Sequence, residues 1–400
     1  MRFIGSKFPR NLFSCLAWRV VLMASALFPV ANFTHLHAAS TIQVLLPGKW
    51  SSASSLSVTV LGDYAYVANG FGGLSVVNVR NPSNCVRVGG AGVGGRAEGV
   101  AVSGIYAFVA HGVSGLVVVN VSNPAYCAIV GGYNTSGDAK DVAVSGNYAY
   151  VADYTNGLEI IDVRDPAHCL RVGGFDTPGH AQRLAVSGNH VYVADSDGGL
   201  QVIDVSDPTN CFRAGSYSFY AEDVAVAGGY AYVAARADGL QIIDVRQPTN
   251  CVRVGEYIFS YSRDIVSHGV AVSGTLVCVV NGYDGLHIID ATDPGNCLRV
   301  GGDNPGGVLR RVSMAAGRIY VAGSFNGMFI LPTLTNVQFT VRVEAETNQP
   351  FTLEAATDLS APMPWSPLIT TNVPTMPFDY VDFDVKTADK PRKFYRVRQP

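Results

Sequence analysis

The sequence is poor in charge and contains no long apolar segment. Only 15% of its 400 residues are Asp, Glu, Lys or Arg, the net charge is −3, and the basic residues are scattered along the chain. A nucleic-acid-binding face needs clustered basic residues, so we expect no nucleic-acid partner. No stretch reaches the about 20 apolar residues of a membrane-spanning helix, and none shows the 3.6-residue period of an amphipathic helix. The absences predict an all-β chain without a transmembrane segment in its mature form.

Motifs typical of catalysis or of a bound cofactor are also missing. The sequence has no nucleophile motif, no phosphate-binding glycine loop and no Cys-x2-Cys pair of the kind that binds zinc. We therefore expect no cofactor and no metal. Whether the protein is an enzyme stays open at this point, with a non-catalytic protein favoured.

The N-terminus has the order of features found in secretory signal peptides. Basic residues such as Arg2 and Lys7 precede an apolar run over residues 20–31, and small residues follow around Ala38. A membrane anchor is the alternative, but the run is shorter than the about 20 residues that span a bilayer. We expect residues 1–39 to be a signal peptide and the mature protein to be secreted or held at the cell surface.

Glycine is abundant, with 43 residues, and one motif returns throughout the chain. Residues 157–166 have the sequence Gly-Leu-Glu-Ile-Ile-Asp-Val-Arg-Asp-Pro. Related stretches end at a series of prolines: Pro82, Pro124, Pro166, Pro208, Pro248, Pro294 and Pro332. A fixed period of about 40 residues is typical of a repeat architecture.

Each copy predicts four short antiparallel strands. In the copy over residues 139–181 the β-branched and aromatic stretches lie at 141–145, 148–152, 158–163 and 169–173. Gly146-Asn147 is a hairpin dipeptide, and Asp165-Pro166 favours a turn. Four antiparallel strands per repeat form the blade of a β-propeller.

The second strand of each copy carries a large residue at one position. The aromatic members of this row are Tyr66, Phe108, Tyr150, Tyr192, Tyr232 and Tyr320. Aromatic side chains contribute strongly to core packing, so we expect this row to pack between blades and not to stack on a ligand.

The repeated Gly-Leu-x-Ile-Ile-Asp-Val-x-Asp-Pro motif, followed by Arg-Val-Gly, resembles the LVIVD-repeat family of extracellular bacterial β-propellers. The resemblance covers roughly residues 56–331. It implies a secreted or surface-associated propeller and brings no common enzymatic activity with it.

Hairpin turns predict seven blades over residues 40–334. They fall at Gly62, Gly104, Gly146, Gly188, Gly228, Gly274 and Gly317. The last copy lacks a fourth strand after Pro332, whereas residues 41–47 resemble a fourth strand without a blade. We expect residues 41–47 to complete blade seven, since ring closure removes the exposed strand edges that invite aggregation.

Six cysteines recur at one position of the repeat: Cys85, Cys127, Cys169, Cys211, Cys251 and Cys297. A disulfide needs Cα atoms within about 7 Å, and equivalent positions on separate blades should lie farther apart. We expect free thiols that pack as small apolar side chains at the turn into strand four.

Composition changes after residue 334, where the repeat ends. Alternating stretches at 339–346, 351–355, 378–382 and 392–397 predict strands. The segment resembles a short β module at the C-termini of secreted bacterial proteins, so residues 335–400 are expected to form a small β-sandwich-like domain. Attachment to the cell surface or matrix and a passive cap are both open roles.

Polar residues precede strand one in most copies and form the candidate binding site. Because strand one should be the innermost strand of each blade, these residues should ring the mouth of the central channel. They are Glu98, Lys140, Arg183, Glu222, Asp223, His268, Arg310 and Arg311. Ordinary solvated loops would show the same polar variety. Arg310 and Arg311 form the most positive part, which favours an acidic ligand.

Two classes of function follow from this arrangement. The first is a monomeric, non-catalytic binding or scaffold module for an extracellular protein or polysaccharide. The alternative is an extracellular polysaccharide hydrolase or lyase that uses Glu98, Glu222, Asp223 or His268 as acid and base, because glycoside hydrolysis requires paired carboxylates.

Overall fold

A computed structural model describes residues 48–52, 54–259, 267–324 and 327–332, together with six strands at 35–37, 339–344, 350–356, 366–372, 378–382 and 394–398. The chain divides into two compact units. One consists of Val44–Thr333, and the other of Met1–Gln43 with Leu334–Pro400.

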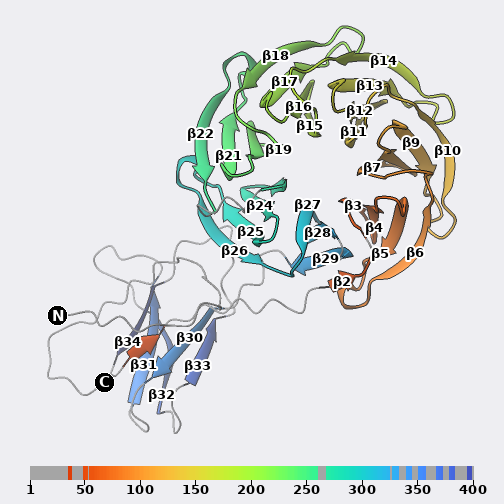
Figure 1. Cartoon of the computed structure of the whole chain (residues 1–400). Helices are drawn as coiled ribbons and strands as arrows, with labels where there is room; N and C mark the ends of the chain where they lie inside the picture. The colour runs from red at the N-terminus through yellow and green to blue at the C-terminus, as the bar shows by residue number, and fades with distance from the viewer. Residues whose placement is uncertain are drawn as a thin grey trace. The chain divides into compact units, whose positions relative to one another are not determined.

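The larger unit is a seven-bladed β-propeller, and each blade is a four-stranded antiparallel sheet (Figure 1). Blades 1 to 3 contain β3 (Ser57–Leu61), β4 (Tyr64–Ala68), β5 (Leu74–Asn78) and β6 (Val86–Ala91); β7 (Gly99–Ser103), β8 (Tyr106–Ala110), β9 (Leu116–Asn120) and β10 (Ala128–Tyr133); and β11 (Asp141–Ser145), β12 (Tyr148–Ala152), β13 (Leu158–Asp162) and β14 (Leu170–Phe175).

Blades 4 to 6 contain β15 (Arg183–Ser187), β16 (His190–Ala194), β17 (Leu200–Asp204) and β18 (Phe212–Tyr217); β19 (Asp223–Ala227), β20 (Tyr230–Ala234), β21 (Leu240–Asp244) and β22 (Val252–Tyr257); and β23 (Gly269–Ser273), β24 (Leu276–Asn281), β25 (Gly285–Asp290) and β26 (Leu298–Asp303). Blade 7 contains β27 (Val308–Ala315), β28 (Arg318–Ser324), β29 (Gly327–Pro332) and β2 (Gly48–Trp50). The predicted seven blades of four strands are confirmed.

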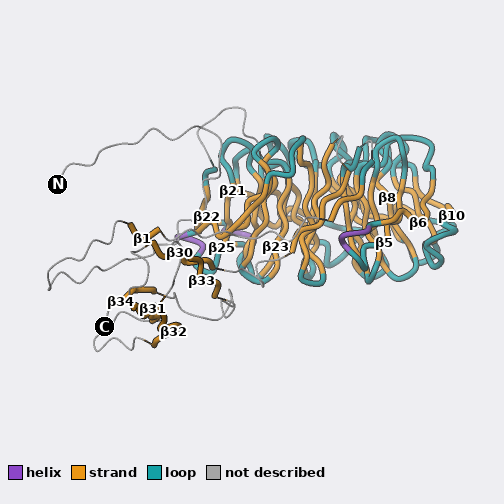
Figure 2. Tube along the Cα trace, turned by 90° about the horizontal axis from the view of Figure 1, so that it is seen from below, coloured by secondary structure: helices purple, strands orange, loops and turns teal. Residues whose placement is uncertain are grey.

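The first strand of each blade lies innermost, as expected. First strands of neighbouring blades contact one another around the whole ring, from β3 and β7 to β27 and β3. The strands run between two opposite faces, and loops cover both faces (Figure 2). Residues that enter strand one therefore lie on one face, close to the axis.

The turn before strand four is built by the two carboxylates of the repeated motif. In blade 3, Asp162 Oδ1 accepts a hydrogen bond from the Arg164 backbone N–H at 3.0 Å, and Asp165 Oδ1 accepts from the Ala167 N–H at 3.1 Å. Pro166 fixes φ inside the same turn. The motif thus encodes the reversal that places strand four on the outside of the blade.

The glycine of Arg-Val-Gly is needed where neighbouring blades meet. In blade 3 the ladder between β13 and β14 shifts register after Ile160, which pairs with Gly173. A Cβ on Gly173 would lie 1.8 Å from the carbonyl oxygen of Pro208 in the next blade. The same close approach recurs at Gly89, Gly131, Gly215 and Gly255. Only glycine fits these positions, so the motif encodes blade-to-blade packing.

The core lies between adjacent blades. Tyr150 of blade 3, 5% exposed, packs with Val191 and Val193 of blade 4. The other aromatic residues of the strand-two row occupy equivalent clusters. The prediction that this row packs between blades is confirmed.

The repeated cysteines pack into the same clusters. Cys169 is buried and the other five are partly buried, and all six are free thiols in the structure. In blade 3 the Cys169 thiol donates to the Pro166 carbonyl at 3.3 Å. Five of the six thiols contact the proline carbonyl three residues earlier in this way, whereas Cys211 donates to the Gly174 carbonyl at 3.0 Å.

An N-terminal strand completes the last blade. β2 pairs antiparallel with β29, and Gly48 lies opposite Ile330. A Cβ on Gly48 would lie 2.3 Å from the Pro82 carbonyl oxygen, so Gly48 takes the place of the strand-four glycines. The predicted strand at 41–47 lies outside the described residues, and the strand that pairs with β29 begins at Gly48.

The described strands of the smaller unit form two three-stranded antiparallel sheets. One has the order β1 (His35–His37), β30 (Phe339–Glu344), β33 (Phe378–Asp382). The other has the order β32 (Ser366–Asn372), β31 (Pro350–Ala356), β34 (Phe394–Arg398). β1 belongs to the segment expected to be a signal peptide. Over the described parts of both units, no helix has the length and apolar character needed to cross a membrane.

Candidate functional site

Two loops of every described blade junction meet on the face where the chain enters strand one. The loop between strands two and three forms an isolated bridge with the loop that leads into the next blade. The bridges are Gly70 with Ala97, Gly112 with Ala139, Tyr154 with Ala181, Ser196 with Ala221, Arg236 with Ser267, Gly282 with Leu309 and Ser324 with Ser54. We call this surface the entry face, and it carries all eight predicted site residues.

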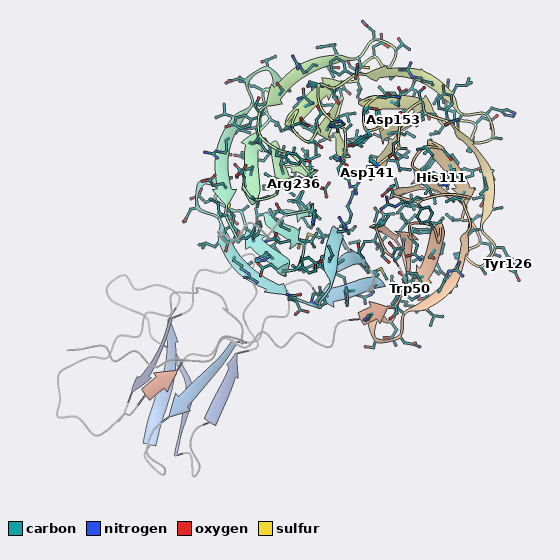
Figure 3. All side chains as sticks on the ribbon, viewed as in Figure 1. Trp50, His111, Tyr126, Asp141, Asp153 and Arg236 are labelled. Carbon is teal, nitrogen blue, oxygen red and sulfur yellow. The ribbon has the colours of Figure 1, made fainter. Side chains whose placement is uncertain are left out.

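Four charged residues fill the channel at one equivalent position of strand one, opposite an alanine of strand two. Asp141, Arg183 and Asp223 come from the consecutive blades 3, 4 and 5, and Arg311 comes from blade 7. Arg311 binds Asp141 Oδ2 at 3.0 Å and lies 3.8 Å from Asp223 Oδ2. Asp141 points to the inside of the ring (Figure 3). We call these four residues the axial cluster.

Backbone groups hold the axial cluster in place. Arg183 donates to the carbonyl oxygens of Lys140 and Gln182, both at 2.8 Å. Asp223 Oδ2 accepts from the Val270 N–H at 3.0 Å. At the equivalent position of blade 2, a Cβ on Gly99 would lie 2.6 Å from Asp141 Oδ1. The small residue of blade 2 therefore leaves the space that the charged side chains occupy.

Burial and neighbouring charge oppose each other in the axial cluster. Burial raises the pKa of Asp223, although Arg311 and Arg183 act in the opposite direction. Burial also lowers the pKa of Arg183, and the neighbouring Arg311 adds to this effect. For Arg311 burial alone would lower the pKa, but Asp141 and Asp223 raise it overall. The charges of the two arginines and the two aspartates cancel, so the cluster has no free positive charge for an anion. It is better explained as a structural element that closes the channel.

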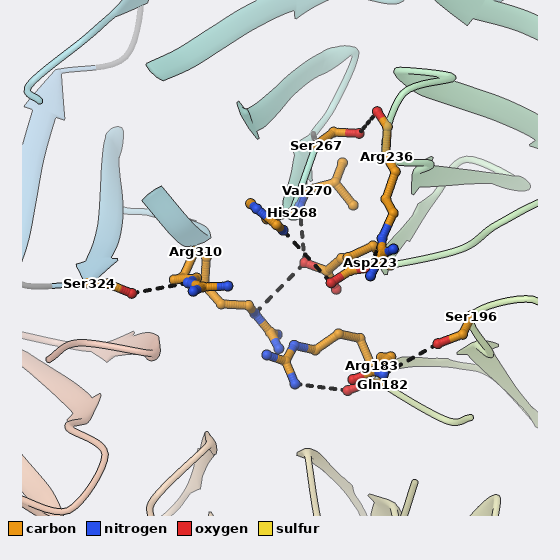
Figure 4. Close-up of polar contacts among 12 residues, drawn as sticks. Gln182, Arg183, Ser196, Asp223, Arg236, Ser267, His268, Val270, Arg310 and Ser324 are labelled. Carbon is orange, nitrogen blue, oxygen red and sulfur yellow. Dashed lines mark hydrogen bonds and ion pairs between the residues drawn. The ribbon is translucent and has the colours of Figure 1, made fainter. Parts of the chain in front are cut away.

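The remaining predicted residues lie around the cluster, each with a partner. Glu98 pairs with Arg96 at 2.8 Å, and Lys140 pairs with Asp138 at 2.7 Å. Glu222 pairs with Arg236 at 2.9 Å and lies 3.8 Å from His268 Nδ1. Arg310 Nε donates to Ser324 Oγ at 3.0 Å. Figure 4 shows Arg183, Asp223, His268 and Arg310 converging on this part of the entry face. The structure thus divides the eight residues between the axial cluster and an outer rim, defined as Glu98, Lys140, Glu222, His268 and Arg310.

The bridging position of the strand-two loop has a left-handed backbone in blades 1 to 6, whereas Ser324 of blade 7 does not. Blades 1, 2 and 6 use Gly70, Gly112 and Gly282, with φ of 55°, 53° and 43°. Blades 3, 4 and 5 instead hold Tyr154, Ser196 and Arg236 at φ of 52°, 52° and 49°. A non-glycine residue in this region costs about 1–2 kcal/mol.

The side chains at these strained positions contact the rim and its neighbours. Lys140 Nζ lies 5.2 Å from the centre of the Tyr154 ring, and the Tyr154 ring stacks on His180 with centroids 4.5 Å apart. Arg236 lies over the Tyr220 ring at 4.1 Å while it pairs with Glu222. The strained residues Tyr154 and Arg236 are therefore each part of a polar and aromatic cluster on the entry face.

Polar residues at the end of strand two have a structural role. Asp153 accepts hydrogen bonds from Thr135 Oγ1 at 2.6 Å and from the Gly137 N–H at 2.9 Å. Asp195 makes the same contacts with Thr177 and Gly179 in the next blade. Both aspartates are 0% exposed, so they fix the entry loops and are not available to a ligand.

The sequence predicted the entry face but missed two features of it. Asp141 was not singled out, although it is the principal partner of Arg311. The strained residues Tyr154, Ser196 and Arg236 were also missed, although aligning the repeats on their period sets them against Gly70, Gly112 and Gly282. That alignment is the signal that would have found them.

Comparison with known proteins supports the repeat architecture. The profile described as LVIVD repeat matches residues 53–90, 94–135, 136–177, 178–218, 220–258 and 266–301. No curated protein sequence matches the chain.

Solved β-propellers share the fold at low sequence identity. The β-propeller domain of Cps50 (Swd1) from Myceliophteria thermophila has a TM-score of 0.60 at 12% identity, over 73% of this chain and 99% of that chain. BamB from Moraxella catarrhalis gives 0.51 at 16% identity, over 75% and 98%. The computationally designed protein Ika8 gives 0.54 at 7% identity, over 71% and 98%. At these identities the similarity establishes the fold alone.

Proposed function

The chain belongs to the LVIVD-repeat family, and from that premise we propose that it is an exported, non-catalytic binding or scaffold module. Its ligand is an extracellular protein or polysaccharide, and the outer rim of the entry face holds the ligand. The fold is compatible with this role, because propellers present loops on a rigid frame. Fold alone does not assign a function, so the proposal rests on the chemistry of the face.

The observation that carries the proposal is the strain at Tyr154, Ser196 and Arg236. Blades 3, 4 and 5 keep a side chain at a left-handed backbone position where blades 1, 2 and 6 have glycine. Backbone strain of this kind concentrates at binding and active sites. Two of the three side chains contact the rim residues Lys140 and Glu222. A purely structural loop would be served better by glycine.

The carboxylates favour binding over hydrolysis. A glycosidase needs one carboxyl group with a raised pKa as general acid and a second carboxylate nearby. Burial tends to raise the pKa of Glu222, but hydrogen bonds from His268 and Arg236 lower it overall. Asp223 has a raised pKa, yet its oxygens are engaged by the backbone N–H groups of Val224 and Val270. None of these groups is placed as a free general acid.

The test compares the full chain with a rim variant that carries Lys140→Ala, Arg236→Gly and Arg310→Ala. Both proteins are immobilised and exposed to defined polysaccharides and to a random peptide library. We expect ligands that the wild type retains to bind the variant at least tenfold more weakly, without release of shortened sugars. Equal retention by the variant, or cleavage of a polysaccharide, would contradict the proposal.

Export is tested separately by expressing the full chain and sequencing the N-terminus of the mature protein. We expect the protein outside the cytoplasm and a new N-terminus near Ala38. An intact Met1 on cytoplasmic protein would contradict export.

A further inference from the structure

The entry face carries exposed apolar side chains on one part of its circumference. The residue after each bridging position forms the tip of the strand-two loop. In blades 1, 2 and 6 this residue is Phe71, Val113 or Tyr283, exposed by 86%, 77% and 72%. In blades 3, 4 and 5 the equivalent residues are Thr155, Asp197 and Ala237. The tips in blades 6, 1 and 2 are defined here as the apolar tips; the tip of blade 7 lies outside the described residues.

These side chains are unusual among the described residues. Exposed single apolar residues are common on protein surfaces, but three of the most exposed ones share a single repeat position on one face. Each follows a glycine of the bridging row, whereas blades 3 to 5 have neither the glycine nor a large apolar tip. The entry face therefore has two chemically different sectors. Exposed apolar side chains that gather on one face indicate an interaction site.

The opposite sector has an excess of acidic side chains. Asp176, Asp197 and Asp238 lie in entry-face loops of blades 3 to 5 and are exposed. Within the described part of the chain, none of them pairs with a lysine or arginine, and Asp197 has only His180 at 3.6 Å. The cations of this sector are already engaged: Lys140 pairs with Asp138, Arg236 pairs with Glu222, and Arg183 belongs to the charge-balanced axial cluster. Negative charge remains uncompensated here.

Resting on the proposed function, we propose that the ligand is a polypeptide segment with large apolar side chains at one end and lysine or arginine at the other. The apolar end lies over the apolar tips, where each fully buried side chain contributes about 1.5–3 kcal/mol. The basic end lies over Asp176, Asp197 and Asp238, which set the direction of binding and its salt dependence. An acidic polysaccharide would meet uncompensated carboxylates, and a neutral one would leave them without a partner.

This inference reverses the charge expected from the sequence. Arg310 and Arg311 suggested an acidic ligand, but Arg311 is bound within the channel by Asp141. Arg310 remains exposed and donates to a serine. The free charge of the face is therefore acidic.

The experiment uses the full chain and a phage-displayed library of random peptides. Enriched peptides are synthesised, and their Kd values are measured by fluorescence anisotropy against three variants. The tip variant carries Phe71→Ser, Val113→Ser and Tyr283→Ser. The acid variant carries Asp176→Asn, Asp197→Asn and Asp238→Asn. The control is Tyr126→Ser, because Tyr126 is 81% exposed and lies at the outer circumference (Figure 3).

We expect enriched peptides with aromatic or leucine residues at one end and basic residues at the other. The tip variant should raise Kd at least tenfold. The acid variant should raise it about threefold at low salt and reduce its salt dependence. The control should bind as the wild type does, and all variants should keep their melting temperature because every altered side chain is exposed.

Several results would overturn the inference. Peptides that bind the tip variant and the wild type equally, enrichment of acidic peptides, or failure to enrich any peptide would each do so. If ligands respond to the rim variant but not to the tip variant, the proposed function stands and this inference fails. If ligands respond to neither variant, both fail.

Discussion

At one buried position on strand three, the identity of the side chain determines whether stability depends on pH. The equivalent residues in blades 4, 5 and 6 are Gln201, Gln241 and His287, exposed by 1%, 4% and 2%. Each contacts a residue of its own strand-two loop: Gln241 Nε2 donates to the Asp238 carbonyl at 2.7 Å, and His287 Nε2 lies 2.9 Å from Asp284 Oδ2. Glutamine makes this contact with the loop and has no titratable proton, whereas histidine makes the stability of the loop depend on pH.

Replacing His287 by Gln should reduce the pH dependence of stability. Burial and Arg299 lower the pKa of His287 to about 4, although Asp284 acts in the opposite direction. Between pH 4 and about 6.5 the unfolded chain binds a proton at this residue and the folded chain does not, so stability rises with pH in this window. Between pH 7 and pH 5 the wild type should lose about 2 kcal/mol through this group.

Urea unfolding at the two pH values measures this loss. His287→Gln should retain most of that free energy at pH 5. His111, whose pKa burial also lowers, supplies a second contribution that remains in the variant. An unchanged difference between pH 7 and pH 5 in the variant would show that His287 is not the responsible group.

Residue types at the site were predictable, but their partners were not. The sequence placed Arg311 on the entry face because strand one follows it. It did not predict that Arg311 of blade 7 pairs with Asp141 of blade 3, which lies four repeats earlier in the chain. That contact is possible because blades 2 and 6 have glycine, Gly99 and Gly269, at the equivalent position, where a side chain would collide with Asp141 or with the backbone at Arg311. Local patterns carry no information about such a choice.

At the scale of the element, strand four shows where pattern recognition succeeds and where it ends. In the repeat over residues 139–181, hydrophobic stretches and turn residues predicted all four strands, and the fourth is observed at Leu170–Phe175 where 169–173 was expected. The register shift next to Ile160 was not predicted. It lies where Gly173 packs against Pro208 of the next blade. A feature that depends on the neighbouring repeat cannot be recognised within one repeat.

Replacing Gly173 by Ala should weaken the contact between blades 3 and 4. The added Cβ would meet the Pro208 carbonyl oxygen at 1.8 Å, and a backbone atom cannot rotate away. Overpacking of this kind costs about 1–3 kcal/mol or more. The control is Gly92→Ala, since a Cβ on Gly92 meets no atom within 4 Å and Gly92 has no positive φ.

Thermal unfolding of the two variants measures the effect. Gly173→Ala should unfold several degrees below the wild type, whereas Gly92→Ala should have the melting temperature of the wild type. Equal melting temperatures for all three proteins would mean that the blades can separate locally without cost. The close approach of Gly173 to Pro208 would then not require glycine.

At the scale of the molecule, the repeats predicted a ring, and the missing strand of the last copy predicted how it closes. Residues 41–47, which were expected to close the ring, lie outside the described residues, and the strand that pairs with β29 in the structure is Gly48–Trp50. Closure joins the first and last blades by more than one contact. Trp50 packs in the cluster that joins them, and Arg318 donates to the Val79 carbonyl at 2.9 Å.

Removing β2 should therefore open the ring. A chain that lacks residues 1–50 leaves the edge of β29 without a partner, whereas one that lacks residues 1–39 keeps β2. Both lack β1, so the comparison isolates closure of the propeller. Exposed strand edges pair with other chains, so the shorter protein should unfold several degrees lower and associate as its concentration rises. Differential scanning calorimetry and sedimentation velocity measure the two effects. If both truncated proteins melt together and stay monomeric, packing between blades holds the ring by itself, and pairing of Gly48–Trp50 with β29 adds nothing to its stability.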